Sequence, residues 1–187
     1  MLKDIEIRPV LKDMIIEQNK DLDYRIIDEM TICDGEARVD IAVANGLLYG
    51  YEIKSDADTL QRLINQQECY NKTFDRICIT VGKKYSDSIA EHIPDWWGIY
   101  VAEEDENGNV QLICQRISQD NKEVNSKSLL ELLWRDEVYD FLKKNNIEKI
   151  SGKNRRILRN IIIENFTRQE IKDFTRETIK RREGWRD

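Results

Sequence analysis

Three charged residues occur at spacings that could build a catalytic site. Asp40 lies in the apolar segment RVDIAVA (38–44), and Glu52 and Lys54 lie in LLYGYEIK (47–54). In a β-strand, residues two apart share a face, so Glu52 and Lys54 project together. Two carboxylates and an amine on one patch of a sheet could bind a divalent cation and assist an attacking water, which is the chemistry of phosphodiester hydrolysis.

The face on which Asp40 lies depends on how these two segments pair. A two-residue turn between them leaves Glu52 one residue out of register with Asp40. One extra residue in the second segment restores the match, and we expect a β-bulge at Gly50 to supply it. Asp40 then faces Glu52 with Lys54 on the same side. The opposite, apolar face is then formed by Val39, Ile41, Val43, Leu48 and Ile53.

Two neighbouring carboxylates on a half-buried sheet repel each other, so a positive partner is expected between them. Mg²⁺ or Mn²⁺ prefers oxygen ligands, and the side chains of Asp40 and Glu52 with the backbone carbonyl of Ile53 could supply them. Lys54 would then assist the attacking water or offset charge on a phosphate.

Hydrophobic periodicity predicts the elements that position these residues. The pattern favours a helix, three strands, a second helix and a buried strand, over residues 8–19, 24–32, 38–44, 47–54, 55–74 and 75–82. Ser55, Asp56 and Asp58 are expected to cap the second helix. The order αβββαβ indicates an α/β fold with a mixed sheet. Beyond it we expect a helix at 83–93, a hairpin at 96–104 and 109–116, and helices at 128–145, 153–165 and 167–182.

This arrangement resembles the PD-(D/E)XK nuclease superfamily. Asp40 takes the place of the motif's Asp, and Glu52-Ile53-Lys54 that of its (D/E)XK, while Val39 replaces the usual Pro. The resemblance covers residues 24–117 well and the chain from about 129 more loosely.

A second motif points to the RecB-like branch of that superfamily. Gln66 and Tyr70 match its QxxxY element, and residues four apart share one face of a helix. The longer run from RVDIAV to IPDWWGI looks like a small uncharacterised bacterial and phage family within the superfamily. The resemblance implies a restriction-endonuclease-like core and a divalent metal. It does not imply a particular substrate.

The resemblance suggests further site residues. A third acid often enters such sites from the first helix or strand, and Glu29 is our choice, with Glu17 as its rival. Arg38 and Arg62 are candidates for contacts with phosphate, although surface ion pairing explains them nearly as well.

Charge divides the chain into two parts. Residues 143–187 hold fourteen Lys and Arg against seven Asp and Glu, a net charge of +7, which leaves −13 for residues 1–142. We therefore divide the chain into a nuclease-like core, residues 1–120, and a basic helical extension packed on it, residues 121–187. A basic surface beside an acidic metal site fits nucleic acid, and two solvated helical faces are the alternative.

Several other features argue against particular functions. Cys33, Cys69, Cys78 and Cys114 form no CxxC pair and are expected to be buried thiols. The single histidine, His92, disfavours histidine-based chemistry. The chain shows no signal pattern and no membrane-length apolar run, so a cytoplasmic protein is expected. The pair Trp96-Trp97 is assigned to packing, with base stacking as the alternative.

Our leading hypothesis is a Mg²⁺- or Mn²⁺-dependent nuclease that acts on nucleic acid, with DNA as the expected substrate. Asp40 and Glu52 bind the metal, Lys54 assists the attacking water, and Gln66 with Tyr70 positions the strand. An alternative is a catalytically weak nucleic-acid-binding adaptor or complex subunit with the same fold. A third reading makes the C-terminal helices a protein-interaction platform, and a homodimer is an open possibility. The apolar stripe of that platform is Leu129, Leu130, Leu132, Leu133 and Trp134.

Overall fold

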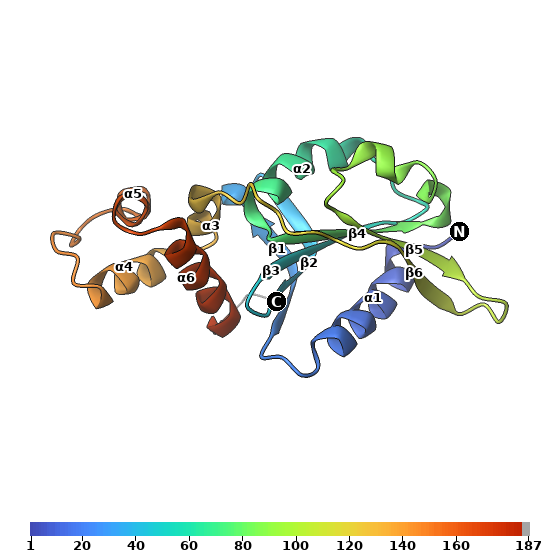
Figure 1. Cartoon of the computed structure of the whole chain (residues 1–187), viewed down its shortest axis with the longest axis horizontal. Helices are drawn as coiled ribbons and strands as arrows, with labels where there is room; N and C mark the ends of the chain where they lie inside the picture. Colours follow the sequence, from blue (N-terminus) through green and yellow to red (C-terminus); the bar gives the residue numbers. More distant parts are fainter. Residues whose placement is uncertain (185–187) are drawn as a thin grey trace.

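The computed structural model describes residues 1–184 and shows an α/β protein with one six-stranded mixed sheet (Figure 1). The strands lie in chain order. They are β1 (Arg25–Ile32), β2 (Ala37–Ala44), β3 (Leu48–Lys54), β4 (Arg76–Gly82), β5 (Gly98–Glu104) and β6 (Val110–Arg116). The pairs β1-β2, β2-β3 and β5-β6 are antiparallel, whereas β3-β4 and β4-β5 are parallel. The predicted order αβββαβ and the predicted hairpin are confirmed.

Helices cover both faces of the sheet. Helix α1 (Asp4–Asn19) lies on one face and α2 (Gln61–Thr73), which connects the parallel strands β3 and β4, lies on the other (Figure 1). The prediction of one apolar face was wrong for Val39 and Leu48, which pack in the cluster beneath α2. Ile41, Val43 and Ile53 pack beneath α1. Because helices cover both faces of the sheet, both sides of β2 and β3 carry apolar residues.

The register of β2 and β3 corrects the predicted bulge. Ala44 pairs with Leu48 across a three-residue turn, in which Gly46 takes a φ of +106° that favours glycine. Gly50 pairs regularly with Ala42 and forms no bulge. A Cβ on Gly50 would lie 2.9 Å from the side chain of Ile77, so close packing explains this glycine. The extra residue lies in the turn, and Asp40 still comes opposite Glu52 at the end of the ladder.

Residues 55–60 form a turn before α2, so the predicted capping roles were wrong. The carboxylate of Asp58 accepts hydrogen bonds from the amide (2.9 Å) and the hydroxyl (2.6 Å) of Ser55. Asp56 accepts hydrogen bonds from the backbone amides of Leu2 and Lys84, both at 3.0 Å. Asp56 thus connects its own loop to the N-terminal segment and to the turn after β4, and neither aspartate caps a helix.

Two short 3-10 turns, Lys83–Tyr85 and Ile89–His92, replace the helix predicted over residues 83–93. The Tyr85 hydroxyl donates a hydrogen bond to the carbonyl of Asp58, so this segment packs along the loop that precedes α2. The backbone amide of Lys84 and the hydroxyl of Tyr85 donate hydrogen bonds to that loop, and the segment does not form a continuous α-helix.

The C-terminal part folds into four helices, where three were expected. They are α3 (Ser126–Glu131), α4 (Arg135–Lys144), α5 (Arg155–Asn165) and α6 (Arg168–Arg181). The helix predicted over 128–145 breaks because the carbonyls of Glu131 and Leu132 accept hydrogen bonds from Arg159 and Arg182, each at 2.8 Å. Thr167 and Glu170 form a capping box at the start of α6, as their spacing of three residues favours.

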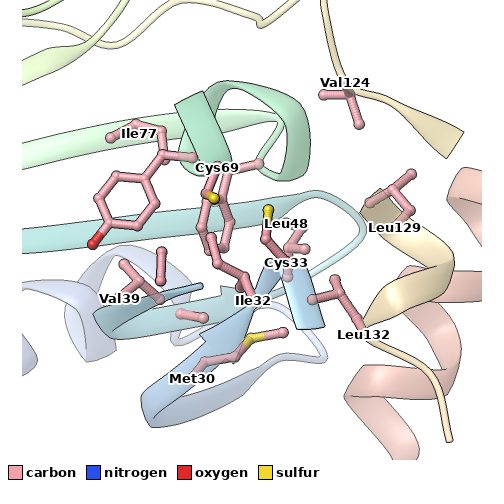
Figure 2. Close-up of a cluster of buried hydrophobic side chains, with 14 of the residues drawn as sticks. Met30, Ile32, Cys33, Val39, Leu48, Cys69, Ile77, Val124, Leu129 and Leu132 are labelled. Atoms are coloured by element: carbon pink, nitrogen blue, oxygen red, sulfur yellow. The ribbon is translucent and has the colours of Figure 1, made fainter. Parts of the chain in front are cut away.

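These helices share their core with the sheet. Figure 2 shows Val124, Leu129 and Leu132 in the same buried cluster as side chains of β1, β2, β4 and α2. An ion pair adds a second link, because Asp75 before β4 accepts hydrogen bonds from Arg176 of α6 at 2.7 and 2.9 Å. The two predicted ranges, 1–120 and 121–187, thus pack together, and the last three residues of the second range lie outside the described residues.

The tryptophan pair and three of the four cysteines are buried or packed against the core, as expected. Trp97 is fully buried and Trp96 packs against the same core, as expected. Cys33, Cys69 and Cys78 are buried, but Cys114 is exposed because it lies on the edge strand β6. No helix within residues 1–184 has both the length and the apolar character to cross a membrane.

Candidate functional site

A pocket of about 470 Å³ gathers most of the predicted site residues at the ends of β2 and β3 beside α2. The predicted residues that line it are Glu29, Arg38, Asp40, Glu52, Ile53, Lys54, Arg62 and Gln66. Tyr70 is fully buried, and its hydroxyl donates a hydrogen bond to the carboxylate of Glu52. Glu17, the rival acid, does not line this pocket and pairs instead with Lys20 on the surface.

Glu52 is the most buried charged group of the site, with 2% of its surface exposed. Its two carboxylate oxygens accept one hydrogen bond each, from Lys54 Nζ (2.5 Å) and from the Tyr70 hydroxyl (2.5 Å). Burial and the negative charge of Asp40 raise the pKa of Glu52 to about 7, although Lys54 and Tyr70 oppose the shift. A carboxylate held in this way attracts any cation that reaches it.

The QxxxY pair completes a network around Glu52 and Lys54. The Gln66 side chain donates a hydrogen bond to the Tyr70 hydroxyl (3.0 Å) and accepts one from Lys54 (3.4 Å). The Tyr70 hydroxyl also lies 2.9 Å from the carbonyl of Arg38. Because Gln66 and Tyr70 lie one helical turn apart on α2, the two side chains meet on the face turned toward β3. The structure therefore brings the two predicted motifs together.

Asp40 lies across the sheet from this network. Its carboxylate accepts hydrogen bonds from the backbone amide of Ile53 (2.7 Å) and from Arg8 of α1 (2.9 Å). Burial raises the pKa of Asp40 above its ordinary value, while the Ile53 amide and the Arg8 charge partly offset this effect. The amide bond to Ile53 fixes Asp40 directly beside the segment that carries Glu52 and Lys54.

Arg8 is the site residue that the sequence did not reveal. Its guanidinium contacts the Asp40 carboxylate, the Asp40 carbonyl (3.2 Å), Glu29 (3.2 Å) and Asp4 (2.8 Å). The hydrogen bond to Asp4 and the charges of Asp4 and Asp40 raise the pKa of Arg8 further, so it stays protonated. The spacing of Asp4 and Arg8 on α1 predicts an ion pair along the helix, but not the side of the sheet that this pair meets.

Glu29 lies at the pocket, as expected, and is shared between two arginines. One carboxylate oxygen lies 3.2 Å from Arg8 and the other 2.8 Å from Arg38. Glu29 has a φ of +53°, uncommon for a non-glycine residue, at a break in the β1-β2 pairing. Its position fits a third acid of the site, and its present partners are cations of the protein.

The two arginines proposed for phosphate contacts lie at the mouth of the pocket. Arg38 has 65% of its side chain exposed, and Arg62 is exposed on the first turn of α2. Together with Lys54 they surround the acidic floor with positive charge, an arrangement that suits a phosphate approaching a metal from solvent.

The residues of this pocket fit a divalent cation in part. The buried carboxylate of Glu52 and the half-buried carboxylate of Asp40 form a donor set that suits a hard cation, since the charge of Asp40 raises the pKa of Glu52. Against this, Arg8 and Lys54 already neutralise the two carboxylates. Within residues 1–184, no group of three or more His, Cys, Asp or Glu side chains is placed to hold a metal, so backbone oxygens or water would complete the coordination.

Comparison with known proteins matches nearly the whole chain to one family model. The family model described as bacteriophage P4 protein cII matches residues 2–185. Protein cII of Enterobacteria phage P4 is 25% identical over 182 residues, which are 97% of this chain and 68% of that protein. A structure of a protein of unknown function from Silicibacter pomeroyi aligns with 78% of this chain and 96% of its own, at 17% identity and a TM-score of 0.45.

Proposed function

This chain belongs to the bacteriophage P4 protein cII family, and we propose that it is a Mg²⁺- or Mn²⁺-dependent nuclease of the PD-(D/E)XK type. DNA is the expected substrate. The observation that carries the proposal is the convergence of Asp40, Glu52 and Lys54 with Gln66 and Tyr70 in one pocket. Its support is chemical, because two acids, an amine and a hydrogen-bonding pair are the groups that phosphodiester hydrolysis requires.

The topology supports the finer fold assignment within this proposal. An antiparallel β1-β2-β3 unit is followed by α2 and the parallel strand β4, and the proposed site lies where β2 and β3 diverge. This is the arrangement expected of a restriction-endonuclease-like core. Open α/β sheets commonly place functional groups beyond strand ends, where side chains of different strands converge on solvent.

In the proposed reaction, the residues of this chain have separate roles. Asp40 and Glu52, with the Ile53 carbonyl, would hold the cation, which supplies positive charge to the phosphate as negative charge develops on it. Lys54 is held 2.5 Å from Glu52, so its ammonium group is aimed into the pocket, where it orients the attacking water. Gln66 and Tyr70 keep Lys54 and Glu52 in place, and Arg38 and Arg62 bind the phosphates on either side.

One observation favours a second candidate, an adaptor that binds nucleic acid and turns over slowly. Arg8 bridges Asp40 and Glu29 and supplies the positive charge that a metal would otherwise supply. A site neutralised in this way could bind phosphate with its arginines and lack the cation needed for cleavage. The two candidates differ in their response to divalent metal.

The test is cleavage of end-labelled single- and double-stranded DNA and RNA in Mg²⁺, Mn²⁺ or EDTA. The wild type is compared with Glu52→Gln and with Glu68→Gln, a control at an exposed carboxylate of α2 that pairs only with Lys72 on the same helix. We expect metal-dependent cleavage that Glu52→Gln abolishes and Glu68→Gln retains. Metal-independent cleavage, or equal cleavage by Glu52→Gln, would contradict the nuclease assignment. Binding without cleavage of any substrate would favour the adaptor.

A further inference from the structure

Three phenylalanines form a half-buried aromatic seam between α4 and α6, apart from the site described above. Phe141 of α4 stacks on Phe174 of α6 with ring centroids 3.8 Å apart, and its ring lies 4.8 Å from that of Phe166 at the end of α5. All three rings are only partly buried. They line a groove of about 640 Å³, and none of the residues lining it also lines the pocket of Asp40 and Glu52.

Carboxylates border this aromatic seam on both sides. The acidic lining residues are Glu137 and Asp140 of α4 and Glu170, Asp173 and Glu177 of α6. One lysine, Lys144, is the only basic residue of the lining. The acids recur three, four or seven residues apart on each helix, so they form a stripe along each wall. This acidity stands out because residues 143–187 carry a net charge of +7.

We propose that this groove docks a basic amphipathic helix of a partner protein. Aromatic rings in a groove accept the apolar side chains that such a helix presents at positions i, i+3, i+4 and i+7. The two acidic walls then face Lys and Arg side chains on the flanks of the incoming helix, which fixes its position and excludes acidic partners. The same walls repel nucleic acid, so the groove and the basic surfaces of the chain serve different ligands.

Two of the wall carboxylates, Asp173 and Glu177, can exchange their present partners for those of an incoming helix, whereas Glu137 is held by Arg182 and Glu170 by the capping box of α6. Asp173 lies 3.4 Å from Arg176, and Glu177 lies 3.1 Å from Lys180, both on α6 itself. Such exposed pairs along one helix contribute little to stability, so their loss costs little. A partner that also covers the exposed parts of the three phenylalanine rings adds to the free energy of binding, because removing apolar surface from water is favourable.

The experiment measures binding of a labelled synthetic amphipathic helix of about five turns, with Leu on one face and Lys on the other, by fluorescence anisotropy. The groove variant is Asp140→Lys with Glu177→Lys. The matched control is Asp136→Lys with Glu164→Lys, which reverses the same number of charges at exposed positions outside the groove. Thermal unfolding verifies that both double variants fold.

We expect the wild type and the control to bind alike and the groove variant to bind at least about tenfold more weakly. Hydrogen exchange of the wild-type complex should slow in α4 and α6. Equal binding by the two variants, no binding by the wild type, or protection elsewhere would overturn the proposal. If the wild type instead dimerises by analytical ultracentrifugation and the groove variant is monomeric, the occupant is a second copy and the proposed partner helix is wrong.

Discussion

Replacing Glu52 with Gln should stabilise the metal-free protein. Folding raises the pKa of Glu52 from 4.5 to about 7, chiefly through burial and the charge of Asp40. Between these pH values the folded state keeps a proton that the unfolded chain releases, so the free energy of unfolding falls as the pH rises. At 1.36 kcal/mol per pKa unit, the ionised side chain costs about 3 kcal/mol above neutral pH, as an upper estimate.

Glutamine preserves the hydrogen bonds that Glu52 makes. Its carbonyl oxygen can accept from Lys54, and its amide can donate to the Tyr70 hydroxyl, whose own proton then turns to the carbonyl of Arg38 2.9 Å away. The substitution therefore removes a buried charge without leaving an unpaired polar group. We expect Glu52→Gln to gain about 1–3 kcal/mol in the free energy of unfolding at about pH 8.

The assay is urea unfolding followed by tryptophan fluorescence, in EDTA, at about pH 5 and about pH 8. The gain should appear at the higher pH and shrink at the lower one, where Glu52 of the wild type is protonated. Glu68→Gln, at an exposed carboxylate, should change stability little at either pH. Equal or lower stability of Glu52→Gln at about pH 8 would show that the ionised Glu52 does not destabilise the fold, as would a gain that does not depend on pH.

Other substitutions test further parts of the account. Asp75→Asn should lower the free energy of unfolding in urea by about 3–5 kcal/mol, because the buried Arg176 loses the negative charge that it pairs with. Asp173→Asn, at an exposed partner of Arg176, should lower it by less than about 1 kcal/mol. A similar small loss for both variants would contradict the stabilising role of the Asp75–Arg176 pair. Burial opposes ionisation of Asp75, yet the hydrogen bonds from Arg176 and Leu48 hold its pKa below the ordinary value, so its contribution should be lost as the pH falls below about 4. Arg8→Met should tighten Mn²⁺ binding roughly tenfold in calorimetry because it removes the cation that contacts Asp40, and weaker binding would show that Arg8 instead organises the site. Tyr70→Phe should lower the metal-free free energy of unfolding by about 1–3 kcal/mol in urea, since it removes a buried hydrogen bond to the site, and no loss would contradict the network.

The sequence predicted the proximity of Asp40, Glu52 and Lys54 because strand periodicity and the order of neighbouring strands determine it. It failed to predict how the register arises, since the extra residue could lie either in the turn or at Gly50. The turn accepts it because Gly46 adopts a positive φ. Local sequence does not distinguish the two solutions, although both place Asp40 opposite Glu52.

Features that depend on distant contacts were missed. The position of Arg8 depends on how α1 crosses the sheet, which no local pattern fixes. The break between α3 and α4 depends on Arg159 and Arg182, which come from helices later in the chain. The exposure of Cys114 follows from its place on the edge strand. In each case the deciding partner lies far away in sequence.

Whether this pocket hydrolyses phosphodiester bonds with a divalent cation is best tested with the variant Lys54→Met. We would titrate Mn²⁺ into the wild type and the variant by calorimetry and then measure single-turnover cleavage of end-labelled DNA with saturating Mn²⁺. We expect both proteins to bind Mn²⁺ and the variant to cleave at least about a hundredfold more slowly, because it keeps the carboxylates and loses the amine that orients the attacking water. Cleavage by the variant at the wild-type rate, or no Mn²⁺ binding by the wild type, would contradict the proposed nuclease function.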